Sequence, residues 1–321
     1  MLALIRAPVL EDLAAVDATI RRELASDVVL VNSVAEYIIG AGGKRLRPLL
    51  VVLAARAAGY RADAHASAAA LVEFIHTATL LHDDVVDDSR QRRGRDTANE
   101  VFGSTASVLV GDFLYSRAFQ MMVRLDRMPI MAILADATNT IAEGEVLQLM
   151  NLGDADTTEE RYFEVIYRKT ARLFEAGAEV AAVLAGANES VRLSLAAYGK
   201  HLGNAFQLVD DALDYRSDAA ERGKNLGDDL AEGKPTLPLI HALRHGTAAQ
   251  QALIREAIGG GGLEHLKEIT AAIESTGGLS YTARLAEDEA RKALAALEGL
   301  PGSPYKEALV GLARFAVIRS T

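Results

Sequence analysis

The sequence predicts an all-α protein, on two observations. Nearly every long segment is rich in Ala and Leu, with apolar residues three and four positions apart, which is the period of an amphipathic helix. Alternating β-branched residues, the pattern of a strand, are almost absent. Because long helices joined by short connections pack as antiparallel bundles, we expect a helical bundle.

The predicted helices follow one another between Gly- and Pro-containing breaks. The apolar period predicts long helices over about 65–88, 105–124, 130–150, 158–186 and 190–215. The breaks lie at 40–48, 92–97, 151–157, 221–235, 259–262 and 299–304. No change in composition resembles a linker and no repeat has a solenoid period, so residues 1–321 are predicted to form a single domain.

Composition limits the kinds of binding partner and the cellular compartment that we expect. The formal net charge of -10 argues against a nucleic-acid partner, and the absence of Cys excludes disulfides and thiolate chemistry. The longest uncharged run, 101–111, is short of the roughly 18 apolar residues of a membrane span. The N-terminal segment is interrupted by Arg6 and Pro8, unlike a secretory signal. We therefore expect a cytoplasmic protein.

Acidic and basic residues are crowded in the stretch LLHDDVVDDSRQRRGR at 80–95. Neighbouring carboxylates repel one another unless a cation neutralises them. The pattern D-D-x-x-D in this stretch occurs again at 210–214, and in each copy the first and last Asp share a helix face. Such a pair is usually a solvated face, but here both copies follow apolar helices. Oxygen ligands without His or Cys favour Mg²⁺ bound together with substrate phosphates.

Basic residues that could bind those phosphates lie in or beside the predicted loops. Each of them taken alone is more often an exposed surface side chain. The turn at 40–48 is not a nucleotide-binding P-loop, because Ile38 stands at the first Gly position and Arg45 replaces Ser or Thr. The candidates are Lys44, Arg45, Arg47, Arg92, Arg93, Lys169, Lys224 and Lys234.

Together these motifs resemble the trans-isoprenyl diphosphate synthases, over about residue 30 to the C-terminus. The segments GGKRLRP, LLHDDVVDDSRQRRG, KT, FQLVDDALDY and GKNLGDDLAEGKPT occur in the order of that family. The chain is most similar to the bacterial octaprenyl diphosphate synthases of quinone biosynthesis. The resemblance implies an isoprenoid-synthase-type antiparallel helical bundle around a deep central cavity, usually as a homodimer, with a possible transient membrane contact for product release.

The resemblance also implies a role for each matching residue. The enzyme would add isopentenyl diphosphate to an allylic diphosphate such as farnesyl diphosphate, with three Mg²⁺ ions when substrate is bound. The implied metal ligands, also catalytic, are Asp83, Asp84, Asp87, Asp210, Asp211 and Asp214. The implied residues around the allylic diphosphate and its cation are Arg92, Lys169, Thr170, Gln207 and Lys224. Those implied for isopentenyl diphosphate are Lys44, Arg47, His76 and Arg93.

Product length depends on the helix that precedes the first acidic motif. Ala78 and Thr79 are small where short-chain relatives carry aromatic residues, so a growing chain could pass along this helix. We nominate Met121, Met122 and Ile133 as the floor, although a Met or Ile is more often plain core. Hepta-, nona-, decaprenyl or geranylgeranyl products are the alternatives to octaprenyl.

Three other functions are weighed against this one. The pattern E-x-x-H at 73–76 is found in di-iron bundles, but it occurs once in this chain, whereas a di-iron site needs a second copy. A terpene cyclase would carry a different second motif and many aromatics, which are only 5% here. A non-catalytic partner subunit would have lost Asp residues from one motif, and both are intact.

Overall fold

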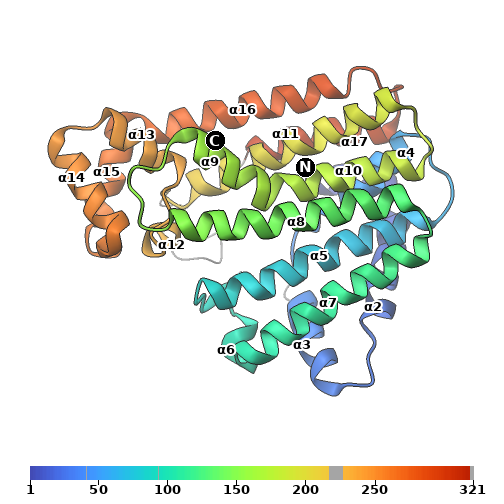
Figure 1. The fold of residues 1–321 in the computed structure, drawn as a ribbon. Coiled ribbons are helices and arrows are strands. Elements are labelled where there is room, and N and C mark those ends of the chain that lie inside the picture. Colours follow the sequence, from blue (N-terminus) through green and yellow to red (C-terminus); the bar gives the residue numbers. More distant parts are fainter. Residues whose placement is uncertain (41, 93, 217–226, 319–321) are drawn as a thin grey trace. The chain divides into compact units, whose positions relative to one another are not determined.

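The chain folds into helices that form two compact units. The computed structural model describes residues 1–40, 42–92, 94–216 and 227–318 (Figure 1). Unit 1 comprises Met1–Thr138, Leu173–Gly199 and Ala296–Leu312. Unit 2 comprises Asn139–Arg172, Lys200–Ala295 and Ala313–Thr321. Some helices contribute residues to both units, and the single domain proposed from the sequence stays a prediction.

Unit 1 contains the N-terminal elements. They are α1 (Leu2–Arg6), the 3₁₀ turn η1 (Ala7–Val9), α2 (Leu10–Leu24), α3 (Val29–Gly40), α4 (Leu46–Ala57), α5 (Ala64–Val86), β1 (Gln91–Arg92), β2 (Arg95–Asp96), α6 (Ala98–Phe102) and α7 (Ser104–Leu125).

Five helices contribute residues to both units, and the remaining elements belong to unit 2. The shared helices are α8 (Met128–Asn151), α10 (Arg172–Leu184), α11 (Glu189–Leu213), α16 (Gly278–Ala296) and α17 (Pro304–Ile318). Unit 2 adds α9 (Glu159–Ile166), the π-helix η2 (Tyr167–Ala171), α12 (Asp228–Ala231), α13 (Leu237–His245), α14 (Ala248–Glu256), η4 (Ala257–Gly261), η5 (Gly262–His265) and α15 (Leu266–Thr276).

The all-α prediction is confirmed, and four of the five long predicted helices appear as single helices. They are α5, α7, α8 and α11. The fifth predicted helix, over 158–186, is instead divided into α9, the π-helix η2 and α10. The break predicted at 92–97 contains a small antiparallel hairpin, in which Gln91 pairs with Asp96 and Arg92 with Arg95.

The core of unit 1 is built around α4 and α5. Ten residues of α4 are buried, because the helix is apolar on almost all sides. Helix α5 packs against α4, α2 and, along most of its length, α7. Gly177 of α10 also approaches closely here, since a Cβ atom at this position would lie 3.1 Å from the Val51 side chain. The first acidic motif therefore extends from a firmly packed helix.

Helix α5 is also the one helix among the described residues that is long and apolar enough to span a membrane. Uncharged runs alone do not identify this helix, because it is apolar on average although Glu73 lies within it. In its most apolar window, 67% of the residues are buried inside the structure. A buried core helix passes the same test of length and composition, so the finding is weak evidence for a span.

In unit 2 a buried carboxylate ties α16 to α11. The Glu289 side chain accepts hydrogen bonds from His201 Nδ1 at 2.8 Å, Asn204 Nδ2 at 2.9 Å and Lys292 Nζ at 2.6 Å. Burial alone would raise the pKa of this carboxyl, but the three hydrogen bonds outweigh burial and lower the pKa to about 2. The ionised form is therefore the one that holds the two helices together.

Replacing Glu289 with Gln is expected to destabilise the protein by about 2 kcal/mol at pH 7, because hydrogen bonds to a charged group are lost. The contribution is fully present above the pKa of an unfolded Glu, about 4.3. It is lost as the pH falls towards the folded pKa of about 2, so the difference between the two proteins should shrink on acidification. Urea unfolding at pH 7 and pH 3 measures both effects.

The matched control for this experiment is Glu287→Gln, which changes an exposed residue of the same helix. Its free energy of unfolding should stay within about 0.5 kcal/mol of the unchanged protein. Equal destabilisation by the two substitutions would contradict a specific role for Glu289.

Candidate active site

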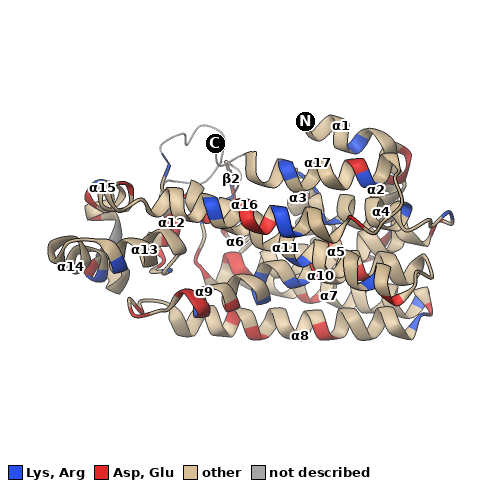
Figure 2. Cartoon of the chain, turned by 90° about the horizontal axis from the view of Figure 1, so that it is seen from above, with Lys and Arg blue, Asp and Glu red and all other residues tan. Residues whose placement is uncertain are grey.

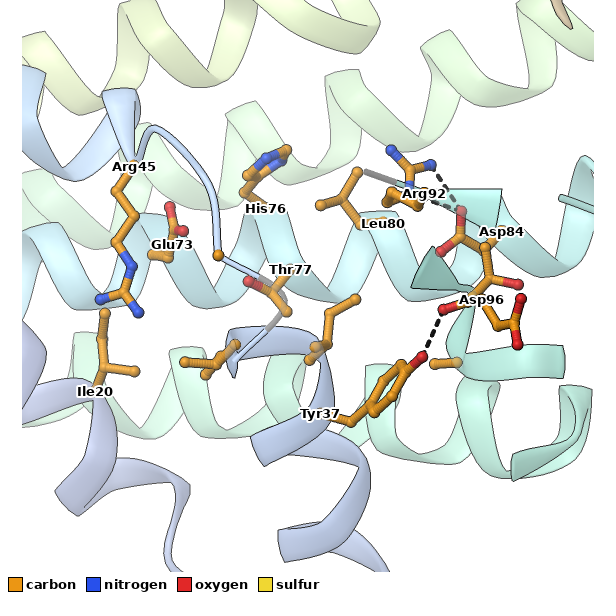
Figure 3. A pocket seen from close by; sticks show the side chains of 15 residues that line it. Ile20, Tyr37, Arg45, Glu73, His76, Thr77, Leu80, Asp84, Arg92 and Asp96 are labelled. Carbon is orange, nitrogen blue, oxygen red and sulfur yellow. Dashed lines mark hydrogen bonds and ion pairs between the residues drawn. The ribbon is translucent and has the colours of Figure 1, made fainter. Parts of the chain in front are cut away.

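A pocket in unit 1 lies beside the first acidic motif. Helix α5 forms its wall, and α3, the turn before α4 and the β1–β2 hairpin complete it (Figure 3). Basic, acidic and apolar side chains face one another across the pocket. Its lining residues are Ile20, Tyr37, Ile38, Ile39, Gly42, Arg45, Glu73, His76, Thr77, Leu80, Asp84, Arg92, Asp96, Thr97 and Ala98.

Arg92 and Asp84 form the central ion pair of this pocket. The hairpin carries Arg92 to the end of α5, where its Nε and Nη2 donate to Asp84 Oδ1 at 2.9 and 2.7 Å. Burial would lower the pKa of the guanidinium, but Asp84, followed by Asp83 and Asp87, raises it above its ordinary value. A permanent positive charge is thus held against three carboxylates.

Both acidic motifs occupy the C-terminal ends of helices. Asp83 and Asp84 lie in the last turn of α5, and Asp87 caps it. In α11, Asp210 and Asp211 lie in the last turn, with Asp214 directly after the helix. The C-terminal end of a helix carries partial negative charge, which disfavours carboxylates and favours cations. The sequence therefore concentrates acids where they need a bound cation, basic partners or hydrogen-bond donors to stabilise them.

These acidic residues fit Mg²⁺ better than a transition metal. Asp84 is fully buried, and its Oδ2 has no hydrogen-bond partner among the described residues. Within that part of the chain, no group of three or more His, Asp or Glu residues is arranged to hold a metal alone. A cation bound here would complete its shell with water and phosphate oxygens, as Mg²⁺ does.

His76 and Arg47, both predicted for isopentenyl diphosphate, lie in contact. Arg47 Nη1 is 3.0 Å from His76 Nε2, and the guanidinium stacks on Phe174 at 4.4 Å. Because Arg can only donate, the His76 Nε2 atom accepts, which leaves its proton on Nδ1.

The other two residues predicted for isopentenyl diphosphate are Lys44 and Arg93. Lys44 does not line the pocket, and its carbonyl accepts from Arg6 Nη2 at 2.7 Å. Arg45 lines the pocket in its place, with a left-handed backbone (φ 42°) and an ion pair to Asp17. Arg93 lies outside the described residues.

In unit 2, Lys169 and Thr170 are carried by the π-helix η2, which the sequence did not predict. A π turn is rare and is frequently found at functional sites. Helix α8 can approach it because residue 144 is Gly: a Cβ there would lie 2.7 Å from Arg168 Cβ and 2.9 Å from the Lys169 nitrogen. The close approach brings the acids of α8 to the cations of η2.

Helix α8 has Asp and Glu but neither Lys nor Arg (Figure 2). Two of its acids pair with η2. Glu143 binds Arg168 at 2.6 Å, and Glu145 binds Lys169 Nζ at 2.5 Å. Lys169 also donates to Gln148 Oε1 at 2.7 Å. The ammonium group is thus oriented before any anion binds.

A second network in unit 2 joins Thr170 to the second acidic motif. Thr170 Oγ1 donates to Gln207 Oε1 at 2.8 Å, and Gln207 Nε2 donates to Asp211 Oδ1 at 2.7 Å. Tyr162 donates its hydroxyl proton to Asp211 Oδ2 at 2.5 Å. Burial, followed by the charge of Asp229, raises the pKa of Asp211 to about 8, against the lowering effect of these hydrogen bonds.

The two remaining basic residues predicted to bind phosphate are Lys234 and Lys224. Lys234 is mostly buried and forms an ion pair with Glu232, and its backbone N–H donates to the Asp229 carbonyl at 2.8 Å. Lys224 lies outside the described residues.

The proposed length-determining residues lie along α5, α7 and α8. Ser107 Oγ donates to the Leu81 carbonyl, which places the start of α7 beside the end of α5. Since the two helices pack along one another (Figure 1), Met121 lies about 21 Å further towards the start of α5. Ala78, Met121 and Met122 are buried, whereas Thr79 and Ile133 are partly exposed. Their role stays a prediction.

Sequence reasoning missed Tyr162, Glu145 and Gln148. Tyr162 lies seven residues before Lys169, a helical spacing that could have placed it on the same face. Glu145 and Gln148 share a helix face of α8, but nothing in the pattern indicated which residue they contact. Glu73, of the E-x-x-H pattern, lines the pocket with His76.

Comparison with known proteins gives consistent matches. Residues 28–276 match the family described as Polyprenyl synthetase. The chain is 56% identical to octaprenyl diphosphate synthase of Escherichia coli (strain K12), over 96% of each chain. It is 50% identical to the all-trans-nonaprenyl-diphosphate synthase (geranyl-diphosphate specific) of Rhodobacter capsulatus, over 98% of this chain and 97% of the other.

Solved structures also match this chain over its whole length. A polyprenyl synthase from Caulobacter crescentus CB15, complexed with calcium and isoprenyl diphosphate, has a TM-score of 0.97 at 46% identity and covers 100% of this chain and 98% of its own. A decaprenyl diphosphate synthase from Rhodobacter capsulatus has a TM-score of 0.94 at 44% identity, with 100% of both chains covered.

The close approach of α8 to η2 predicts the effect of Gly144→Ala. The added methyl group meets backbone atoms at 2.9 Å, so the helices must move apart and the Lys169–Glu145 pair should weaken. We expect a loss of about 1 to 3 kcal/mol in the free energy of unfolding. The control Gly259→Ala, where nothing lies within 4 Å, should change little. Equal stability of the two variants would show that the contact is loose.

Proposed function

Because the chain belongs to the polyprenyl synthetase family and is a prenyltransferase, we propose that it is an all-trans-octaprenyl diphosphate synthase. The observation that carries the proposal is its 56% identity to the Escherichia coli octaprenyl enzyme over 96% of both chains. The resemblance to this family inferred from the motifs is confirmed. The enzyme would join isopentenyl diphosphate head to tail to an allylic diphosphate, with farnesyl diphosphate as the starter.

Mg²⁺ is the cofactor that this proposal requires. The family is Mg²⁺-dependent in general, and the Caulobacter structure contains a divalent cation with a diphosphate. The carboxylates that would hold it are Asp83 and Asp87 in unit 1, and Asp210 and Asp214 in unit 2. Their positions at helix C-terminal ends support this. Asp84 and Asp211 stay predicted ligands, and binding of three ions is part of the proposal. Bound Mg²⁺ would neutralise the diphosphate leaving group.

Breaking the allylic C–O bond places negative charge on the diphosphate and positive charge on the carbon. Arg92 and Lys169 would stabilise the departing diphosphate, since both are held in place by carboxylates before substrate binds. The Gln207 amide oxygen and the Thr170 hydroxyl would face the carbocation. Exclusion of water is needed as well, because water would convert the cation to an alcohol.

Isopentenyl diphosphate would bind beside Arg47 and His76. Their contact orients the guanidinium, and Phe174 supports it from one face. The double bond of this substrate attacks the carbocation and a proton is then lost from the adduct. The diphosphate released in the first step would take that proton, and we assign no protein side chain as the base.

A different product length is the second candidate, and two comparisons favour considering it. The chain is 50% identical to a nonaprenyl synthase and 44% identical to a decaprenyl synthase, so this overall similarity does not fix the number of units. The side chains at Ala78 and Thr79 are too small to stop growth at a short product. We therefore place the decision in the deeper residues.

We also propose that the enzyme acts as a homodimer through α7. Large apolar side chains are exposed on this helix, with Leu109 61% and Val123 63% accessible and Phe119 also exposed. Such a row is costly in water and is typical of an interface. Contact with a membrane during product release, and action in the cytoplasm, stay predictions.

Incubation of the purified protein with Mg²⁺, farnesyl diphosphate and labelled isopentenyl diphosphate tests the main proposal. We expect elongation that stops mainly at the octaprenyl stage, sized by reversed-phase separation after dephosphorylation, and none after chelation of the metal. A nonaprenyl or decaprenyl main product would overturn the proposed length, and no elongation would overturn the function.

The variant Met122→Ala tests the floor of the product channel. Removal of this buried side chain leaves a cavity in which further isoprene units can fit, so the product distribution should shift to longer chains. The control is Met128→Ala, which changes a methionine that is 73% exposed. An unchanged distribution for Met122→Ala would remove this residue from the length-determining set.

A further inference from the structure

The turn before α4 is contacted by both N-terminal helices. The Arg6 side chain of α1 reaches the backbone of this turn, where its Nη2 donates to the Lys44 carbonyl oxygen at 2.7 Å. The next residue, Arg45, forms an ion pair through Nη1 with Asp17 of α2. Arg6 and Asp17 precede 28–276, the part of the chain that matches the family. Membership of the family therefore assigns neither residue a role.

The backbone of this turn adopts conformations that need support from neighbouring groups. Gly42 (φ 73°) and Gly43 (φ 150°) occupy regions open mainly to Gly, and Arg45 is left-handed (φ 42°) although it carries a Cβ atom. Such a conformation persists only where the surroundings fix it. Two fixing contacts come from the N-terminal helices, one to the peptide group of Lys44 and one to the Arg45 side chain.

The two N-terminal helices are themselves anchored to the core of unit 1. In α1, Ile5 is buried and lies against α17, since a Cβ atom at Gly311 would be 3.1 Å from the Ile5 side chain. In α2, the Asp12 carboxylate accepts from Arg56 Nε of α4 at 3.1 Å and from His65 Nε2 of α5 at 2.9 Å. Both helices are therefore firm supports for the turn.

Helix α2 also forms part of the pocket. Ile20 lines the pocket and lies three residues after Asp17, on the same helix face. Figure 3 shows Arg45 extending from the turn towards Ile20. Arg47 follows two residues after Arg45, in the first turn of α4, and contacts His76 of the pocket wall. One short segment thus connects α2 to the residues that would bind isopentenyl diphosphate.

We propose that α1 and α2 hold the turn before α4 in the shape that binds isopentenyl diphosphate, with Arg6 and Asp17 as positioning residues. The inference rests on the proposed function and deepens it, because it concerns the site of one substrate. Neither residue contacts the substrate in this arrangement. Arg6 fixes the peptide group of Lys44, and Asp17 neutralises Arg45. Lys44 and Arg47 are then the cations offered to the diphosphate.

Loss of either contact should weaken the binding of isopentenyl diphosphate alone. Arg6→Met removes the donor to Lys44, and Asp17→Ala removes the partner of Arg45. Each should raise KM for isopentenyl diphosphate about threefold, because single contacts near the surface have small effects. The double variant should raise this KM about tenfold. The KM for farnesyl diphosphate and kcat should stay unchanged, as expected when only the binding of one substrate is weakened.

The two substitutions change the charge beside the pocket in opposite directions. By long-range attraction alone, Asp17→Ala would favour an anionic substrate and Arg6→Met would disfavour it. A rise in KM for both variants is therefore the result expected of positioning and not of net charge. The conservative variant Asp17→Glu keeps a carboxylate for Arg45 and should leave this KM close to that of the unchanged protein.

The matched controls are Glu11→Ala and Arg21→Met, which make the same charge changes at exposed residues of α2. Both should leave all three kinetic constants unchanged. Thermal unfolding of each full-length variant shows that assays are made on folded protein. Limited trypsin cleavage after Lys44 and Arg45 reports on the turn without any substrate, and it should be faster in the double variant than in the unchanged protein.

The inference is overturned if the double variant keeps the KM for isopentenyl diphosphate of the unchanged protein, or if its KM for farnesyl diphosphate rises equally. It is also overturned if Asp17→Glu or the controls raise KM as much as Asp17→Ala does, or if trypsin cleaves the turn at the same rate with and without the two contacts. Failure of the unchanged protein to elongate would instead overturn the proposed function, and the trypsin comparison would still test the two contacts.

Discussion

Carboxylates crowded at the C-terminal ends of helices repel one another and also meet the negative end of the helix dipole, and the surroundings of both acidic motifs relieve this repulsion. At the end of α5 an ion pair reduces the repulsion, because the hairpin carries Arg92 to the buried Asp84. At the end of α11 the relief comes from neutral donors, the Tyr162 hydroxyl and the Gln207 amide. The two copies of one sequence pattern are therefore stabilised by different chemistry.

Uncharged hydrogen-bond donors have a specific advantage at Asp211. The Tyr162 phenol and the Gln207 amide hold the Asp211 carboxyl group in place without adding a charge beside Asp210 and Asp214. Glu145 of α8 acts in the same sense on Lys169, because it holds the ammonium group in one orientation. Polar groups in unit 2 are thus ordered in advance of the substrate.

The sequence predicted the helices well because apolar periodicity is a local property, and α5, α7, α8 and α11 follow it closely. It also identified the acidic motifs, whose spacing is set within one helix. It did not predict the contacts of Tyr162, Glu145 or Arg45, since these depend on which helix packs beside them. The η2 segment was predicted as ordinary helix, because its residues have normal helical propensities and the wider turn arises from its packing with Gly144 of α8.

The π-helix η2 has a consequence for how this site can change. A wider turn accommodates one residue more than an α-helical turn, so the side-chain directions within the turn differ from those of a regular helix. Deleting one residue between 167 and 171 would let the segment close into a regular helical turn and would shift Lys169 and Thr170 from their present directions. The alignment of Lys169 and Thr170 is therefore encoded in chain length as well as in residue type.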